Sequence, residues 1–442
     1  MTTAHPTQPL PPLVSGAAPV IGHLLEFKRD HNRLIQRGYD ECGEIFRFKM
    51  PATPTTVVLL GEHTKQFFKA SELSIRGGYT FLPRILGDRV YFLAPHEDYL
   101  RQKGFVHPRF AGRQLATYVS VINDEAQQLV QQLGASGDFE LMAPLGPMIR
   151  RISARCFVGD AFTRSLPAEL LADLDILSGG VGFSLPAWLP LPVVIRSRRA
   201  RERLRNALMT LIRKRRAEER AEDSDFLQSL VDHRDLNGDP VPDHELVGLI
   251  LLLIWSGQDT TTAHLAWLLV DLLGHPDEMA LVREESERVI SEGVSLGGLQ
   301  RMSRTTACIQ ETGRLRAPAH MLSRSVTTDF KVGEYTIPQG AQVLASPAIS
   351  QRDPNIFVRP DTYQPTRFLG PAAKPLYQAL IGFGSGTHRC LGQNFATIVM
   401  QIVVAHLATT YDMQLIGTPR PSDGFAAKYP AGQCIVRYRR RV

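Results

Sequence analysis

The sequence predicts a mainly α-helical protein with a minor β region, and three observations support this fold class. Leu246–His275 is an apolar segment of roughly 30 residues, longer than a typical globular helix. Arg198–Glu222 is a charged segment of mixed sign, which is typical of a solvated helix. Phe330–Ser346 alternates between polar and apolar residues around turn residues, as short strands do.

The elements are expected in a simple order along the chain. Residues 1–20 form a proline-rich leader, and two strand-like segments, Ile45–Phe48 and Thr56–Leu60, follow. From about Asp98 the pattern becomes helical, and Asp243 is placed to cap the long apolar helix. The chain has 442 residues, 43% of them hydrophobic, without a repeat or a clear linker, so we expect one domain over residues 1–442.

Composition excludes several classes of protein. Five widely spaced cysteines without a Cys-x-x-Cys pair argue against a disulfide framework and a structural zinc site. We see no signal peptide and no membrane-spanning window, so we expect a soluble cytoplasmic protein. We also expect a monomer. The net charge of +6 is not clustered with aromatic residues, which disfavours nucleic-acid binding. It indicates either an ordinary surface or a face that docks an acidic protein partner.

The strongest chemical signal is the glycine-rich segment Phe383–Gly392, which contains Cys390. Glycines let a backbone approach a flat cofactor closely, and amide hydrogens aimed at a thiolate tune its basicity. A helix expected from about Leu391 would place its positive end near the sulfur. Phe383 is suited to shield the thiolate, and His388 or Arg389 to meet an acidic group of the cofactor or a partner. A buried free cysteine in a glycine turn is the alternative explanation.

This segment matches the signature Phe-x-x-Gly-x-(His/Arg)-x-Cys-x-Gly at every fixed position, and the chain therefore resembles the cytochrome P-450 superfamily. The resemblance implies the cytochrome P-450 fold, with haem b between the long oxygen-binding helix and the helix of the cysteine loop. It implies that Cys390 is the iron ligand. The residues of the loop that it assigns to the cofactor are Phe383, Gly384, His388, Cys390 and Gly392.

A second motif is Glu311-x-x-Arg314, an acid and a base on one helical face. By itself this spacing is common by chance. It precedes Pro365–Phe368, and together these segments resemble the family's structural clamp. The resemblance implies that Glu311, Arg314 and Arg367 lock the core near the cysteine loop, because a buried guanidinium needs a carboxylate partner.

The polar turn Ser256–Thr261 interrupts the long apolar helix. A mid-helix glycine and back-bonding threonines weaken a helix locally, as expected at a functional site or at a merely solvated turn. The turn resembles the family's (Ala/Gly)-Gly-x-(Asp/Glu)-Thr motif. By that resemblance Asp259 and Thr260 relay protons during oxygen activation.

Other positions follow from the resemblance. Tyr99, Lys103 and Arg324 are expected to bind the haem propionates, although each cation also suits a plain surface. Segments that resemble the family's substrate-contacting regions are largely apolar and imply a lipophilic substrate. The residues that we expect at the substrate are Tyr79, Leu82, Trp255, Ser256, Met321 and Leu322.

The motifs are nearest to those of the sterol 14α-demethylase branch, especially its soluble bacterial members. Two departures are Asp259, where that branch usually has histidine, and Leu93, where it expects an acid. We therefore expect a monooxygenase that oxidises another lipophilic molecule, such as a terpenoid, steroid or polyketide. The alternatives are sterol 14α-demethylation, a haem–thiolate isomerase or synthase that does not use O2, and a non-catalytic haem sensor.

No reductase domain is recognisable, so electrons would come from a ferredoxin or flavodoxin chain. An acidic carrier of this kind would dock on a basic face that includes Arg101, Arg109, Arg113 and Arg389.

Overall fold

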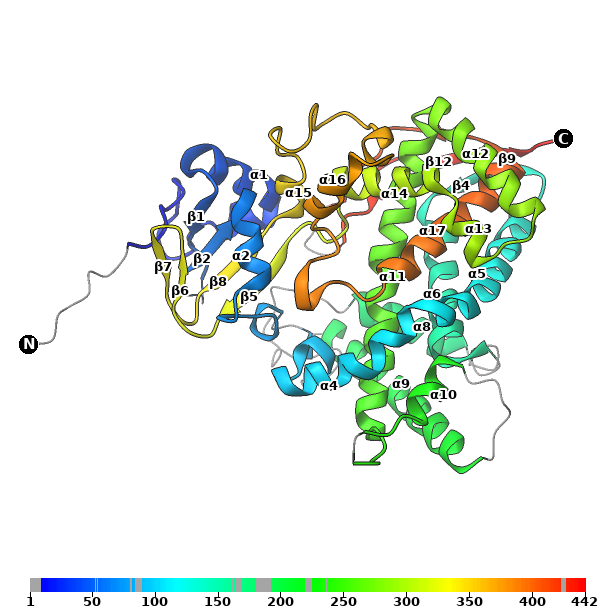
Figure 1. Ribbon diagram of the computed structural model, residues 1–442, viewed down its shortest axis with the longest axis horizontal. Helices are drawn as coiled ribbons and strands as arrows, with labels where there is room; N and C mark the ends of the chain where they lie inside the picture. The colour runs from blue at the N-terminus through cyan, green and yellow to red at the C-terminus, as the bar shows by residue number, and fades with distance from the viewer. Residues whose placement is uncertain are drawn as a thin grey trace, which may run out of the picture. The chain divides into compact units, whose positions relative to one another are not determined.

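The computed structural model describes residues 9–51, 53, 55–79, 82–83, 90–160, 163, 168–179, 192–218, 225–235, 237–422 and 427–442 (Figure 1). Contacts divide the chain into two compact units. The sheet unit contains residues 1–80, 310–390 and 422–428, and the helix unit contains residues 81–309, 391–421 and 429–442. Each unit is described by itself, and the expected single domain stays a prediction.

The sheet unit is built on a five-stranded sheet in the order β1-β2-β8-β5-β3, of which β1, β2, β8 and β5 are labelled in Figure 1. Strands β2 and β8 run parallel, with Thr56 opposite Gln342, and the other neighbours are antiparallel. The strands are β1 (Ile45–Phe48), β2 (Thr56–Leu59), β3 (Leu73–Ser74), β5 (Leu322–Val326) and β8 (Gln342–Ala345), and a separate hairpin consists of β6 (Phe330–Val332) and β7 (Tyr335–Ile337). The predicted strands near residues 45, 56 and 330–346 are thus confirmed.

Apolar side chains on both faces of this sheet form two core clusters. On one face Leu34 and Ile35 of α1 (Leu24–Cys42) pack with Phe46 and Phe48 of β1. On the other face Phe67 of α2 (Thr64–Lys69) packs with alternate residues of the same strands. Helix α1 was not predicted from the sequence, because few of its residues are apolar. The unit also contains the short helices α15 (Pro347–Ser350) and α16 (Ala373–Ala379), and the 3-10 turns Pro365–Phe368 and Gly386–His388.

The helix unit consists of long helices and a small antiparallel sheet in the order β4-β12-β9. Its helices are α4 (His96–Val106), α5 (Gly112–Leu133), α6 (Met142–Val158), α8 (Ala168–Gly179), α9 (Pro192–Ala217), α10 (Phe226–Val231), α11 (Asp243–Leu273), α12 (Pro276–Ser291), α13 (Leu296–Gln300) and α17 (Gln393–Thr410). Its strands are β4 (Ser136–Glu140), β9 (Tyr411–Ile416), β10 (Arg420–Pro421), β11 (Pro430–Ala431) and β12 (Ile435–Arg440). Helix α14 (Ser303–Leu315) crosses the boundary between the two units.

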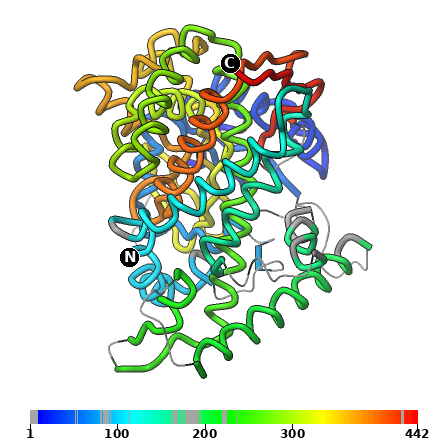
Figure 2. The backbone as a smooth tube through the Cα atoms, turned by 90° about the vertical axis from the view of Figure 1, so that its right-hand side faces the viewer, coloured from blue at the N-terminus to red at the C-terminus, as the bar shows by residue number. Residues whose placement is uncertain are grey.

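Helix α17 runs beside α5 in the core of the helix unit (Figure 2). Phe395 of α17 contacts Tyr118 of α5 and Phe157 of α6, with ring centroids 5.6 and 5.1 Å away. Aromatic rings at these separations attract each other beyond the effect of their buried area. The contacts anchor the first turn of α17, the helix that follows Cys390 in the sequence.

The predicted long apolar helix is α11, which has 31 residues. Among the described residues it is the one helix whose length and composition suit a membrane span, but 67% of its most apolar window is buried in the protein. The predicted cap was wrong. Pro242 occupies the capping position, and the Asp243 carboxylate instead accepts a hydrogen bond of 2.8 Å from Arg216 Nε of α9. An arginine from a neighbouring helix thus takes the place of a local backbone donor.

Helix α11 also carries a buried imidazole that makes stability depend on pH. His264 is 3% exposed, and its Nε2 lies 2.9 Å from the carbonyl oxygen of Ile309. Burial lowers the pKa of His264 to about 4 from its ordinary 6.5, although the carbonyl opposes this shift. The folded state therefore binds fewer protons than the unfolded state as pH falls from 6.5 to 4. This difference lowers the free energy of unfolding by about 3 kcal/mol as the pH falls from 6.5 to 4.

We expect His264→Gln to reduce this loss, because an amide can still donate to Ile309 but does not titrate. Urea unfolding followed by circular dichroism, from neutral pH to about pH 5, measures the effect. His96→Gln is the control, since His96 is exposed. An unchanged dependence of unfolding free energy on pH in the His264 variant would contradict the prediction.

Candidate functional site

The residues predicted from the sequence divide between the two units. Residues 383–390 of the cysteine loop, the clamp and Arg324 belong to the sheet unit, whereas the helix unit contains Gly392, Asp259, Thr260, Tyr99 and Lys103. The surroundings of each set of residues are therefore described from contacts within the same unit.

The cysteine loop is closed by backbone hydrogen bonds. The amide of Cys390 donates to the carbonyl oxygen of Phe383 at 2.8 Å, and the amide of Gly384 donates to Ile381 at the same distance. Gly384 and Gly386 have φ angles of 69° and 64°, a left-handed conformation that favours glycine. A Cβ at Gly386 would lie 3.1 Å from the carbonyl oxygen of Phe68. The two glycines thus allow the loop to turn tightly and pass close to α2.

The loop fits an iron porphyrin. All five cysteines lie in described segments, and Cys390 is the exposed one, whereas Cys156, Cys308 and Cys434 are buried. Burial raises the pKa of Cys156 and Cys434, which keeps those thiols protonated. An accessible thiol on a tight glycine loop could serve as a thiolate ligand of a haem iron. Phe383, Gly384, His388 and Gly392 of the same segment are partly buried.

Helix α17 begins at Gln393, two residues later than predicted. Leu391 and Gly392 form a turn, and Gly392 takes the capping position with φ −80° and ψ 5°. This non-helical backbone at the cap explains the later start.

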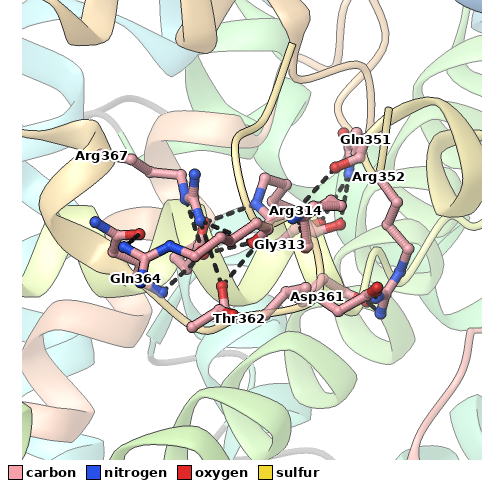
Figure 3. Close-up of polar contacts among 12 residues, drawn as sticks. Gly313, Arg314, Gln351, Arg352, Asp361, Thr362, Gln364 and Arg367 are labelled. Atoms are coloured by element: carbon pink, nitrogen blue, oxygen red, sulfur yellow. Dashed lines mark hydrogen bonds and ion pairs between the residues drawn. The ribbon is translucent and has the colours of Figure 1, made fainter. Parts of the chain in front are cut away.

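The clamp residues form a buried ion-pair network in the sheet unit (Figure 3). Glu311 and Arg314 on α14 are 0% exposed and pair in a bidentate way, at 2.8 and 2.9 Å. Arg367 Nε donates to the same carboxylate at 3.1 Å. The backbone amide of Gln364 donates to it as well, at 2.8 Å. The carboxylate therefore accepts four hydrogen bonds, which offsets the cost of burying a charge.

Arg314 extends this network to the backbone. Its Nη1 donates to the carbonyl oxygens of Gln351 and Pro360, at 2.9 and 2.7 Å. Its guanidinium carbon also lies 5.1 Å from the ring centroid of Phe357. One arginine thus holds several turns of the segment that leads to the cysteine loop. Gln351, which sequence analysis did not single out, is part of this arrangement, and no local sequence pattern marks it.

The polar turn of α11 bonds back to its own helix. Thr260 Oγ1 donates to the carbonyl oxygen of Ser256 at 2.9 Å, and Thr262 Oγ1 donates to that of Gln258 at 2.7 Å. Hydroxyl groups that bond in this way loosen the helical ladder. Thr260 is exposed, whereas Thr262 is buried. The exposed hydroxyl of Thr260 is therefore accessible to water or a ligand.

The carboxylate of Asp259 accepts a hydrogen bond from the phenol of Tyr429, next to β11. Burial, with help from Asp259, raises the pKa of Tyr429 and keeps the phenol protonated. Asp259 also lines a cavity of about 370 Å³ in the helix unit. Other polar residues that line this cavity are Glu140, Arg150, Gln258, Thr262 and Tyr429. Tyr429 was not predicted as a site residue, since nothing in the local sequence connects it with Asp259.

Two of the predicted propionate ligands are neighbours on α4. The ammonium of Lys103 lies 5.9 Å from the ring centroid of Tyr99, and Tyr99 packs edge-on against Tyr91. Arg324 lies on β5 of the sheet unit, where it is 5% exposed and stacks 4.9 Å from the ring of Phe67. The structure brings Tyr99 and Lys103 together, and it holds Arg324 rigidly at the sheet.

The predicted substrate residues fall into two groups. In the sheet unit the amide of Ser323 donates to Tyr79 Oη at 3.4 Å, which places Tyr79 beside the start of β5. Met321 and Leu322 are partly buried and pack against the two opposite core clusters of the sheet. Leu82, Trp255 and Ser256 belong to the helix unit, where Leu82 is buried and the other two are partly buried. The segments Tyr79–Phe92 and Gly179–Pro192 resemble regions that contact the substrate in the family, and their residues 80–81, 84–89 and 180–191 lie outside the described residues.

The predicted docking cations are used partly within the protein. Arg101 pairs with Glu245 at 2.8 Å, and Arg109 donates to the side chain and the carbonyl oxygen of Ser229, each at 2.6 Å. Burial lowers the pKa of Arg109. Arg389 is exposed, and the side chain of Arg113 lies outside the described residues.

Comparisons with known proteins agree with this geometry. A family model described as cytochrome P-450 matches residues 11–428. A sterol 14α-demethylase of Mycolicibacterium vanbaalenii is 30% identical over 98% of this chain and 98% of its own length. The lanosterol 14-alpha demethylase of Rattus norvegicus is also 30% identical, over 98% of this chain and 88% of its own length.

A solved structure shows the same fold. Retinoic acid-bound cyanobacterial CYP120A1 superposes with a TM-score of 0.87, at 24% identity, over 98% of this chain and all of the other. The predicted fold class, mainly α with a minor β region, is thereby confirmed. The family match over nearly the whole length, together with the exposed cysteine on its glycine loop, means that the chain belongs to the cytochrome P-450 family of haem b-dependent monooxygenases.

Proposed function

We propose that this protein is a monooxygenase that hydroxylates a lipophilic small molecule of the terpenoid, steroid or polyketide type. The observation that carries the proposal is the acid–alcohol pair of α11, in which an exposed Thr260 hydroxyl follows Asp259, a residue that lines a cavity together with other polar and charged side chains. When bound through Cys390, haem b reduces O2 and transfers one oxygen atom to the substrate. The other oxygen atom leaves as water, which consumes two electrons and two protons.

Asp259 and Thr260 supply these protons. The Thr260 hydroxyl donates to Ser256 and keeps its lone pairs available for a water molecule. The cavity beside Asp259 is lined by charged and polar groups, so water can bring protons to the carboxylate. Tyr429 stays protonated and holds the carboxylate through its hydrogen bond. Isomerases and synthases that do not use O2 have no need of such a pair, which disfavours that alternative.

The expected substrate follows from the residues near the polar turn. Helix α11 is apolar before this turn, and Leu82 of the same unit is buried. The indole Nε1 of Trp255 is buried and has no hydrogen-bond partner within the described ranges. A buried donor of this kind favours a lipophilic molecule that carries a hydroxyl or keto oxygen. Steroids and oxygenated terpenoids have this character.

Sterol 14α-demethylation is the second candidate, and the relatives favour it. The relatives from Mycolicibacterium vanbaalenii, Rattus norvegicus and Sorghum bicolor are described as sterol, lanosterol and obtusifoliol 14-alpha demethylases, each about 30% identical to this chain. Asp259, in place of the histidine usual in that branch, argues for a different substrate. We also propose a ferredoxin-type electron donor, a monomeric state, no membrane span and a cytoplasmic location.

The test begins with the purified holoenzyme and a panel of steroids, terpenoids, polyketides and sterols. A substrate shifts the haem from low to high spin when it binds, and its product is then sought with a ferredoxin, its reductase and NADPH. A hydroxylated product supports the proposal, and a 14-demethylated sterol supports the second candidate. Rearrangement of a peroxide without NADPH would refute both.

We expect Thr260→Ala and Asp259→Asn to lower the rate of product formation by about 10² or more, because general acid–base catalysis contributes on this scale. Both variants should still show the spin shift, since neither residue is the proposed iron ligand. Thr409→Ala is the matched control, because Thr409 Oγ1 makes the same back-bond, to Ala405 at 2.8 Å, on a different helix. Product formation by the two α11 variants at the rate of this control would contradict the relay.

A further inference from the structure

A single buried amide, that of Gln351, connects the clamp to the cysteine loop. Gln351 follows α15 and is 1% exposed. Its Nε2 donates to the carbonyl oxygens of Gly313 and Arg314, at 3.1 and 3.0 Å. Its Oε1 accepts hydrogen bonds from the backbone amides of Ile381 and Gly382, both at 2.9 Å. Figure 3 shows Gln351 directed at the end of α14.

These four bonds use the full capacity of one carboxamide. A primary amide has two N–H donors and an oxygen with two lone pairs. The partners also define its orientation, because carbonyl oxygens require the nitrogen and backbone amides require the oxygen. A carboxylate in this place would set an oxygen against the carbonyls of Gly313 and Arg314, and an aliphatic side chain would leave all four buried groups unpaired.

The two amides that Gln351 holds lie at the start of the cysteine loop. Phe383 comes next in the sequence, and its carbonyl oxygen accepts the hydrogen bond from the Cys390 amide at 2.8 Å. Ile381 itself accepts the bond from Gly384 that closes the loop. The position of the Cys390 backbone therefore depends on the segment that Gln351 tethers. The other end of the tether is rigid, because Arg314 is locked by Glu311 and donates to the backbone carbonyl of Gln351.

We propose that Gln351 is a positioning residue for the cysteine ligand. Its hydrogen bonds connect the backbone beside the Glu311–Arg314 pair to the loop that contains Cys390 and so fix the position of that loop. This inference rests on the proposal that Cys390 binds the haem iron. The ion-pair network does not hold the cysteine loop directly. Among the described contacts of Glu311, Arg314 and Arg367, none involves residues 381–390, so the Gln351 side chain supplies the connection.

The test compares Gln351→Met and Gln351→Glu with a matched control. Gln401 is also a buried glutamine, 4% exposed, and its amide donates to Leu299 and Thr306 at 3.0 Å. Gln401→Met therefore removes a comparable buried amide from the helix unit. The readout is the carbon monoxide difference spectrum of the reduced holoenzyme, in which thiolate-ligated haem gives the red-shifted band and haem that has lost the thiolate gives a band at shorter wavelength.

We expect the Gln351 variants to lose the red-shifted band in mild denaturant at least about tenfold faster than wild type, since even one lost buried hydrogen bond changes a rate on this scale. Gln401→Met should lose thermal stability without this acceleration. If the Gln351 variants melt earlier but keep the band as long as the control does, Gln351 is only structural and the proposal is overturned.

If neither Gln351 variant folds, hydrogen–deuterium exchange of the wild-type holoenzyme tests the proposal instead. The amides of Ile381 and Gly382 in the wild-type holoenzyme should be protected as strongly as those of the α14 helix, and free exchange there would overturn the tether. Failure of the haem–thiolate proposal is distinguishable, because Cys390→Ser would then leave the wild-type spectrum unchanged whatever the Gln351 variants do.

Discussion

Cys390→Ser is expected to abolish both the red-shifted carbon monoxide band and product formation. A serine hydroxyl is not ionised near neutral pH and is a much weaker ligand than a thiolate, so the iron loses the donor that promotes O–O cleavage. Cys390 is exposed on its loop, so the substitution removes no core packing and the fold should persist. The difference spectrum of the reduced protein measures the loss of thiolate ligation, and the far-UV circular dichroism spectrum measures whether the fold persists.

The matched control is Cys42→Ser. Cys42 is the partly buried cysteine at the end of α1, and none of the proposed chemistry involves it. This variant should keep the red-shifted band and its activity. A red-shifted band in Cys390→Ser, equal to that of the control, would show that another residue binds the iron.

Glu311→Gln is expected to destabilise the protein by about 3–5 kcal/mol, because it leaves the buried guanidinium of Arg314 without a counter-charge. Both side chains are fully buried, so solvent cannot compensate. Guanidinium unfolding followed by circular dichroism measures the loss, and the haem absorbance follows release of the cofactor in the same titration. We expect the haem signal to be lost at the lower denaturant concentration, since the clamp lies next to the cysteine loop in the sheet unit.

Glu278→Gln is the control for this prediction. Glu278 pairs with Arg304 at 2.6 Å, and both side chains are 17% exposed. Such a partly solvated pair contributes about 1 kcal/mol or less. If Glu311→Gln is no more destabilising than Glu278→Gln, the buried pair does not clamp the core.

Replacing the pair as a whole separates charge from packing. The triple variant Glu311→Leu, Arg314→Met and Arg367→Met removes the carboxylate together with both guanidinium groups that pair with it, so no buried charge is left unpaired, and such replacements are often neutral or stabilising. It also removes the bonds from Arg314 to the backbone carbonyls of Gln351 and Pro360. A stable triple variant that nevertheless binds haem weakly would show that the ion-pair network serves the loop rather than global stability.

Local patterns predicted part of the secondary structure, namely the long apolar helix and the strands near residues 45, 56 and 330–346. The apolar run of α11 and the alternation in β6, β7 and β8 gave the right elements, because periodicity reports which side of an element is buried. Helix α1 was missed, since its burial depends on a sheet whose strands come from distant parts of the chain. The cap at Asp243 was wrong for a related reason, because Arg216 of another helix binds that carboxylate.

The candidate site residues could be proposed from the sequence by itself. Cys390 in its glycine loop, Asp259 beside Thr260 and the Glu311-x-x-Arg314 spacing are patterns within ten residues, and short-range chemistry depends on such neighbours. The tertiary structure alone decided which groups support them. Gln351 meets the loop, and Tyr429 meets Asp259, only because folding brings distant segments together. A buried polar side chain takes whatever partner the fold leaves within hydrogen-bond distance, and no local pattern records that partner.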